Sequence, residues 1–213
     1  AVKVTIDSAS ISGGKLNIKF SATENPDLAG IDVAKISPTV LVGLYGWETK
    51  DYLVGPHERL TDDNGDGKVD NSDQRALEYA VGAKHPRFTT VLAADGKWEV
   101  TADLSPWANM IGGDVWRAEI AVLPSLKDAA GDEVALNAPS RTFNLVSNSF
   151  NDGWYGPIAK AENCNKCHEA LGTTFHSPSY GGNVVVCRLC HTPTNGGSHL
   201  EMQSRSIDSY VHA

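Results

Sequence analysis

Hydrophobic and polar residues alternate along most of the first 146 residues, which is the pattern of β-strands with one face in a core. Two alternating segments, VKVTIDSASI and KLNIKFSA, flank Gly13 and Gly14 and predict a β-hairpin. Two more, RFTTVLAA and KWEVTADL, flank Asp95 and Gly96, which favours a second hairpin with a type I′ turn. TVLVGLYGW, VWRAEIAVL and RTFNLV supply three further strands. Together these segments predict a mainly β domain, either a sandwich or a Greek-key barrel.

One segment of this β-rich region has a helical pattern instead. SDQRALEYAV, at about 72–81, contains several good helix formers. Gly82 follows it, in the position where glycine commonly ends a helix. We therefore expect a single helix there.

The pattern changes after Val146. The segment SNSFNDGWYGP is polar and contains Gly and Pro, so it indicates a linker, and regular hydrophobic periodicity ends beyond it. We place a boundary near 148–156, with a β-rich domain over 1–148 and a small domain over 149–213. This second part is poor in aliphatic residues but holds all four cysteines and five of the seven histidines. A large apolar cofactor is therefore expected to organise it, with irregular and helical structure around it.

Composition and charge narrow the class of protein. The chain has 41% hydrophobic and 21% charged residues, which is typical of a folded globular protein. Its net charge of −8 disfavours nucleic acid and anionic membranes as partners. No stretch approaches the roughly 20 apolar residues needed to span a bilayer. The opening AVKVTIDSAS enters a strand pattern at once, as expected for an exported protein whose signal has been removed.

Two Cys-x-x-Cys-His motifs, CNKCH and CRLCH, carry the candidate chemistry. In c-type haem attachment the two cysteines form thioether bonds to the porphyrin, and the following histidine is the proximal iron ligand. The motifs therefore predict two covalent haems. The residues concerned are Cys164, Cys167 and His168 in the first motif and Cys187, Cys190 and His191 in the second.

Two other readings of the cysteines compete with haem attachment. The spacing C-x2-C-x19-C-x2-C also lies within the range of four-cysteine zinc sites. Zinc has no need for histidine after each pair, however, whereas haem attachment requires it. A thioredoxin-like dithiol would need a βαβ pattern around the motif, and neither motif has one. Haem attachment is the interpretation that accounts for every residue of both motifs.

Three further histidines are candidates for the distal position of each iron. A second histidine closes the iron and favours electron transfer, whereas an open position permits ligand binding or catalysis. We favour His176 and His212 and keep His199 in reserve. His212 ends SRSIDSYVH, a short predicted helix in which Ile207 and Val211 share a face and can pack on a porphyrin. The sequence leaves open which histidine serves which iron.

Residues 62–73, DDNGDGKVDNSD, match the twelve-residue EF-hand calcium loop. Gly67 stands at the sharp turn and Val69 at the hydrophobic position, while aspartate replaces the usual final glutamate, as in the dockerin variant. Because there is one loop and no pair, we expect structural calcium rather than a sensor. The alternative is a solvated acidic loop. The expected ligands are Asp62, Asn64, Asp66, the Lys68 carbonyl, Asp70 through water, and Asp73.

With these motifs in place, the chain resembles the N-terminal part of the outer-surface multihaem cytochromes of metal-respiring bacteria, the decahaem MtrC/OmcA family. The resemblance is carried by CNKCHEALGTTFH, VVVCRLCHTP and SRSIDSYVHA, and by a β domain that leads into haem motifs. It implies a split β-barrel domain followed by bis-histidine haems, with His168 and His191 proximal and His176 and His212 distal. The chain departs from the family in having only two haem motifs.

The function expected from these features is electron transfer through two c-type haems rather than substrate-specific catalysis. The resemblance implies an exported protein, at the outer-membrane surface, extracellular or periplasmic. Its partners would be other multihaem cytochromes, copies of itself, or an external acceptor such as a metal. Two rival hypotheses are a haem enzyme with one open iron that reduces a small substrate, and an adhesive or assembly role for the β domain with calcium stabilising its surface.

Overall fold

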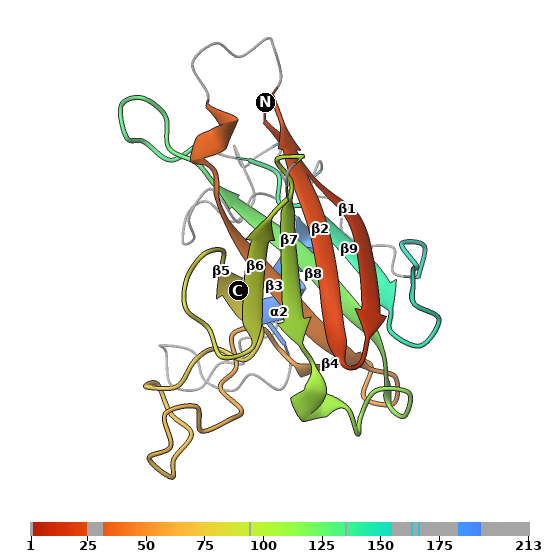
Figure 1. Ribbon diagram of the computed structural model, residues 1–213. Coiled ribbons are helices and arrows are strands. Elements are labelled where there is room, and N and C mark those ends of the chain that lie inside the picture. The colour runs from red at the N-terminus through yellow and green to blue at the C-terminus, as the bar shows by residue number, and fades with distance from the viewer. Residues whose placement is uncertain are drawn as a thin grey trace.

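The computed structural model describes residues 2–24, 32–93, 95–134, 136–154 and 183–192, together with Asn163 and Lys166. These residues form two antiparallel sheets that enclose one main core, and a helix on the outer side of the second sheet (Figure 1). The predicted mainly β fold is therefore confirmed. Among the described residues no helix has the length and apolar character needed to cross a bilayer.

The first sheet has the strand order β1-β2-β7-β6. The predicted hairpin at Gly13 and Gly14 is confirmed, with Ser12 paired to Lys15. The second predicted hairpin, β6 and β7, is confirmed as well, and β2 pairs with β7 to join the two hairpins. The strands of this sheet are β1 (Lys3–Ser12), β2 (Lys15–Thr23), β6 (Phe88–Leu92) and β7 (Trp98–Asp103).

The second sheet has the order β10-β9-β8-β3-β4, with β5 also paired to β3. Its central strands β3 and β8 contain the predicted segments TVLVGLYGW and VWRAEIAVL, which are paired along most of their length. Two 3₁₀ turns, η1 (Val33–Lys35) and η2 (Ser105–Trp107), accompany the sheets, and the helix is α2 (Val184–Cys190). The strands are β3 (Ser37–Gly46), β4 (Tyr52–Val54), β5 (Glu78–Ala80), β8 (Val115–Ser125), β9 (Ser140–Asn144) and β10 (Ser149–Phe150).

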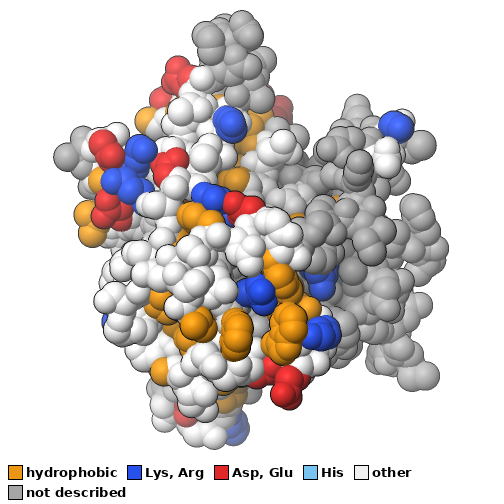
Figure 2. All heavy atoms as spheres, turned by 90° about the vertical axis from the view of Figure 1, so that its right-hand side faces the viewer, with side chains coloured by type: hydrophobic (Ala, Val, Ile, Leu, Met, Phe, Trp, Pro, Cys, Tyr) orange, Lys and Arg blue, Asp and Glu red, His pale blue; other side chains and the backbone are white. Residues whose placement is uncertain are grey.

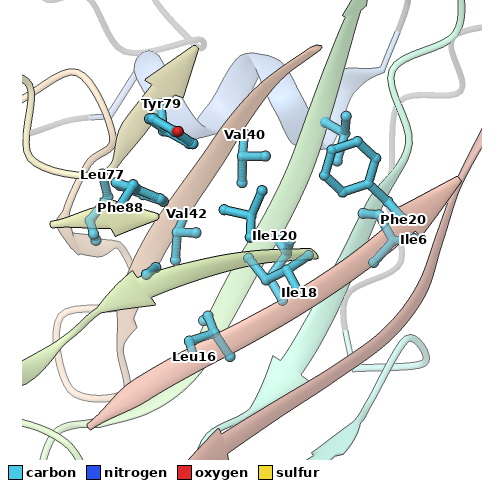
Figure 3. Packing of buried hydrophobic residues seen from close by; sticks show 14 of the residues in the cluster. Ile6, Leu16, Ile18, Phe20, Val40, Val42, Leu77, Tyr79, Phe88 and Ile120 are labelled. Carbon is cyan, nitrogen blue, oxygen red and sulfur yellow. The ribbon is translucent and has the colours of Figure 1, made fainter. Parts of the chain in front are cut away.

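The main core lies between the two sheets, where alternate residues of each strand point inward (Figure 3). Leu16, Ile18 and Phe20 of β2 meet Val42 of β3 and Ile120 of β8 there. This burial of apolar surface supplies most of the driving force for folding.

Contacts at both margins of the sheets close the structure into a barrel-like shape. At one margin the Arg141 guanidinium of β9 donates to the Ile6 carbonyl of β1, with an Nη1–O distance of 3.3 Å. The guanidinium carbon of Arg141 also lies 3.4 Å from the centroid of the Phe150 ring. At the other margin Tyr79 of β5 stacks on Phe88 of β6, with ring centroids 4.9 Å apart. Figure 2 faces the side of β1 and β9, where hydrophobic side chains lie among lysine and arginine side chains.

Two local predictions are wrong. Residues 72–81 do not form a helix: Glu78–Ala80 is strand β5, because Tyr79 and its neighbours pair with β3 and Tyr79 enters the core. The turn between β6 and β7 is not type I′, which needs positive φ at both central residues. Gly96 has a φ of +77°, but the described non-glycine residues with positive φ are only Lys50 and Asn148.

The expected linker after Val146 is partly a strand. Ser149 and Phe150 form β10, which pairs with β9 and extends the second sheet past residue 148. Trp154 then packs against Tyr45, with ring centroids 4.6 Å apart. The division into two domains at 148–156 stays a prediction.

Candidate haem-attachment site

Helix α2 carries the second Cys-x-x-Cys-His motif, and its start is set by Asn183. The Asn183 side-chain oxygen accepts a hydrogen bond from the Val185 amide at 3.0 Å, which satisfies one of the unpaired amides at a helix N-terminus. The Asn183 side-chain nitrogen donates to the Ala138 carbonyl at 2.8 Å and to the Ser140 hydroxyl at 3.0 Å. One side chain therefore begins the helix and also ties it to the segment leading into β9.

One face of α2 is buried against the outer side of the second sheet. Val186 is 2% exposed and Leu189 is fully buried, and both pack in a second apolar cluster with residues of β3, β4 and β8. Leu41 and Tyr45 of β3 belong to this second cluster, whereas Val40, Val42 and Leu44 point into the main core. Because successive side chains of a strand point to opposite faces, α2 and the main core lie on opposite sides of β3. The remaining members of the cluster are Leu41, Tyr45, Tyr52, Ala121, Leu123 and Ala138.

The haem-motif side chains lie on the neighbouring face of α2. Cys187 and Cys190 are three residues apart, and His191 follows at the C-cap, so all three share one side of the helix. The His191 amide donates to the Cys187 carbonyl at 3.0 Å, which keeps the end of the motif in helical geometry. Cys187, Cys190 and His191 are each partly exposed. The sequence prediction that these three residues form one site is consistent with this placement.

Cys190 packs against the cluster beneath α2, and one member of that cluster, Leu41, is paired with Glu78 of β5. Burial raises the pKa of the Cys190 thiol, and the negative charge of Glu78 raises it further, whereas Arg75 acts in the opposite direction. Glu78 accepts a hydrogen bond from Arg75 Nη1 at 2.5 Å, and its other oxygen contacts His57 Nδ1. Burial alone would raise the pKa of Glu78, but the hydrogen bonds and charges of His57 and Arg75 lower it. Glu78 is therefore an ionised, largely buried carboxylate near the motif.

The opposite side of α2 covers a second buried carboxylate, Glu119 of β8. Glu119 is 4% exposed, and the Thr142 hydroxyl donates to its Oε2 at 2.6 Å. Burial raises the pKa of Glu119 to about 7, although hydrogen bonds from Thr142 and Ser140 act in the opposite direction. Glu119 lines an open pocket of about 250 Å³ together with Ser140, Arg141, Thr142, Asp152 and Val185.

The acidic loop over residues 62–73 is folded by its own side chains. Asp62 accepts hydrogen bonds from the amides of Gly65, Asp66 and Gly67. Asp73, which is buried, accepts from three amides of the same loop through its two carboxylate oxygens. Across the residues that the structure describes, no group of three or more His, Cys, Asp or Glu side chains is arranged to hold a metal ion.

A buried ion pair attaches this loop to the first sheet. The Arg87 Nη1 atom lies 2.6 Å from Asp63 Oδ1, and both side chains are largely buried. The same guanidinium donates to the carbonyls of Arg75 and Ala76 and to the Thr61 hydroxyl. The loop is therefore held at both of its ends by one arginine.

Several predicted site residues cannot be located in this way. The first motif and the candidate distal ligands lie outside the described residues. The sequence reasoning also missed the β-domain side chains beside α2, namely His57, Arg75, Glu78 and Glu119, because no motif links them to the cysteines. The N-cap of α2 could be recognised from the sequence, since an asparagine, Asn183, directly precedes VVVCRLC. The residues outside the described part are Cys164, Cys167, His168, His176, His199 and His212.

Among the solved structures with a similar fold are two that belong to a known class of proteins, the outer-membrane decahaem cytochromes. One is MtrC from Shewanella baltica OS185, with a TM-score of 0.51, 18% sequence identity, and coverage of 95% of this chain and 31% of that chain. The other is the outer membrane decahaem cytochrome OmcA, with a TM-score of 0.56, 11% identity, and coverage of 97% of this chain and 31% of that chain.

These likenesses confirm the predicted resemblance at the level of the fold, and the chain spans about a third of the length of each of these proteins. No protein-family model matches the chain, and no curated protein matches it in sequence.

Proposed function

We propose that this chain is an electron-transfer protein that carries two covalent c-type haems. The observation that carries the proposal is the geometry of α2, which carries Cys187, Cys190 and His191 on one face while Val186 and Leu189 hold the neighbouring face on the sheet. A helix anchored in this way keeps both thiols and the imidazole in a fixed relation for haem attachment. Bound haem iron supplies one-electron chemistry.

The first haem is proposed to bind Cys164, Cys167 and His168, by the same spacing of residues. Intact mass under denaturing conditions should show two haem additions that acid-acetone does not extract. A colourless protein containing zinc instead would contradict the proposal and support the four-cysteine zinc reading.

The distal ligands are proposed to be His176 and His212, with His199 as the reserve. Bis-histidine ligation keeps both irons low-spin and favours electron transfer over small-molecule reduction. Removing residues 206–213 should open one iron, giving a high-spin spectrum and new carbon monoxide binding. If the shortened protein stays fully low-spin, His199 or a histidine of a neighbouring molecule holds that position. An intact protein that binds carbon monoxide would favour the haem-enzyme alternative.

The acidic loop is proposed to hold one structural calcium ion through Asp62, Asn64, Asp66, the Lys68 carbonyl and Asp73, with Asp70 acting through water. The residue order of the loop and its anchoring by Arg87 support this proposal. Replacing Asp62 and Asp66 by alanine should lower the melting temperature more in calcium than in chelator, because without the ion only the hydrogen bonds of these side chains within the loop are lost. Asp128→Ala, in another acidic surface turn, is the matched control. Equal melting temperatures with calcium and with chelator in the unaltered protein would contradict the site.

The proposed location is the outer-membrane surface, extracellular or periplasmic, where the protein exchanges electrons with other multihaem cytochromes, copies of itself or an external acceptor. The support is the shared fold with outer-membrane cytochromes. Rapid mixing of the reduced protein with an oxidised multihaem cytochrome should show electron transfer as a change in the haem absorption bands of the two proteins. The absence of any transfer to either a cytochrome or a soluble metal complex would contradict this role.

A further inference from the structure

The structure determines which side of α2 faces which strand. Val185 lines the pocket formed by β8 and β9, and Val186 and Leu189 face the sheet. Cys190 packs against the cluster that contains Leu41 of β3, and Glu78 of β5 is paired with Leu41. Directly paired residues of neighbouring antiparallel strands share a face of the sheet. Glu78 is therefore on the face of the sheet that α2 covers, and a haem joined to Cys190 would be attached on the same face.

Contacts between loops and the helix hold this arrangement in place. A Cβ atom at Gly55 would lie 3.4 Å from the Leu189 carbonyl oxygen, so the chain after β4 passes close to the end of α2. His57 follows two residues later and contacts Glu78. Glu78 itself is paired to Leu41 of β3, which belongs to the cluster beneath α2. Glu78 and the haem motif are thus attached to the same strand.

Glu78 is a fixed charge rather than a mobile surface group. Its side chain is 13% exposed, and Arg75 Nη1 and His57 Nδ1 hold one oxygen each. A charge in such a position is screened by solvent and salt much less than an exposed one. Other charged groups also lie near the helix: Arg188 interacts with Asp51 and Glu119, and a Cβ atom at Gly55 would lie 3.0 Å from Glu58 Oε1 as well as 3.4 Å from the Leu189 carbonyl oxygen.

We propose that Glu78 sets the reduction potential of the haem on the second motif. This inference rests on the proposed function, because it requires a haem on Cys187 and Cys190. Reduction adds one electron to the iron and so removes one positive charge from the site. A fixed carboxylate on the same face of the sheet stabilises the more positive, oxidised state and lowers the reduction potential. The charge of Arg75 opposes this effect, while His57 contributes more than Arg75 to keeping the Glu78 carboxylate ionised.

The test is a spectroelectrochemical titration of the full haem-loaded chain and two variants. Glu78→Gln removes the negative charge and keeps the shape, so the potential of one haem should rise, by about the 59 mV that corresponds to a tenfold change for a one-electron couple. The other haem should be unaffected. Arg75→Gln removes the positive charge and should shift the same haem in the opposite direction. The electrode supplies the electron in this titration.

Glu99→Gln is the matched control, because Glu99 is an exposed acid of β7 that pairs with Lys19 in the other sheet. It should leave both potentials unchanged. Unchanged potentials in both Glu78→Gln and Arg75→Gln would overturn the proposal, and so would shifts of equal sign in the two variants, since those indicate a structural rather than an electrostatic effect. If Glu78→Gln does not fold, Arg75→Gln alone tests the proposal: a lower reduction potential of one haem supports it, and a higher or unchanged potential contradicts it. A chain without covalent haem would instead contradict the proposed function.

Discussion

Gly43 of β3 lies directly beneath Leu189 of α2. A Cβ atom at Gly43 would be 2.5 Å from Leu189 Cδ2 and 2.8 Å from Tyr52 Cδ1, closer than side chains pack. The absence of a side chain at this point of the strand is what lets the helix rest on the sheet.

Gly43→Ala should therefore destabilise the protein by about 1–3 kcal/mol, the usual cost of overfilling a packed core. The added methyl group has to push Leu189 or Tyr52 aside. Thermal or denaturant unfolding measures the change. Gly153→Ala is the control, since a Cβ atom there meets nothing within 4 Å, and its effect should stay within about 0.5 kcal/mol. Equal stabilities of the two variants would show that α2 does not pack on β3 in this way.

Asn183→Ala should cost about 1–2 kcal/mol, because it removes the N-cap bond to Val185. It also leaves the Ala138 carbonyl and the Ser140 hydroxyl without this donor. Asn109→Ala, at an exposed turn position, is the control. The prediction fails if the free energies of unfolding of the two variants agree.

Arg87→Gln should lower the free energy of unfolding by about 3–5 kcal/mol, because it leaves the Asp63 carboxylate buried without its partner. The variant should also loosen the acidic loop, and with it the proposed calcium site. Lys97→Gln breaks an ion pair with Asp7 that is more exposed, and should cost less than about 1 kcal/mol. Chemical denaturation of both variants distinguishes the two costs, and equal costs would contradict a structural role for Arg87.

Glu119 should make stability fall as the pH rises. Its pKa is about 7 in the folded protein against an ordinary value of 4.5, so the folded state keeps a proton that the unfolded state releases between these values. The stabilisation is complete below pH 4.5 and is lost as the pH rises through 7. The difference corresponds to roughly 3 kcal/mol.

Glu119→Gln, which imitates the protonated form, should remove this dependence. The melting temperature of the unaltered protein should fall relative to that of the variant between pH 5 and pH 8. Parallel pH profiles for the two proteins would rule out a buried, protonated Glu119.

Local pattern was enough to predict most strands and to group the side chains of the second Cys-x-x-Cys-His motif on one helix. The hairpin at Gly13 and Gly14 follows from period-two alternation and two glycines, features that act over a few residues. The Cys187–His191 spacing likewise needs only one helical turn to bring its side chains together. Both predictions depend on residues that are close in sequence, so contacts with distant residues have little influence on them.

The tertiary structure alone decided the rest. Glu78 has the helix-forming neighbours of SDQRALEYAV, yet it lies in β5, because pairing with β3 and burial of Tyr79 outweigh a propensity of a few tenths of a kcal/mol per residue. The same pairing places Glu78 next to Leu41, in the cluster against which Cys190 packs, although Cys190 is more than a hundred residues away along the chain. No local sequence pattern predicts that Glu78 and Cys190 pack at the same cluster. This arrangement results from the way one helix packs on one sheet, which depends on contacts between residues distant in sequence.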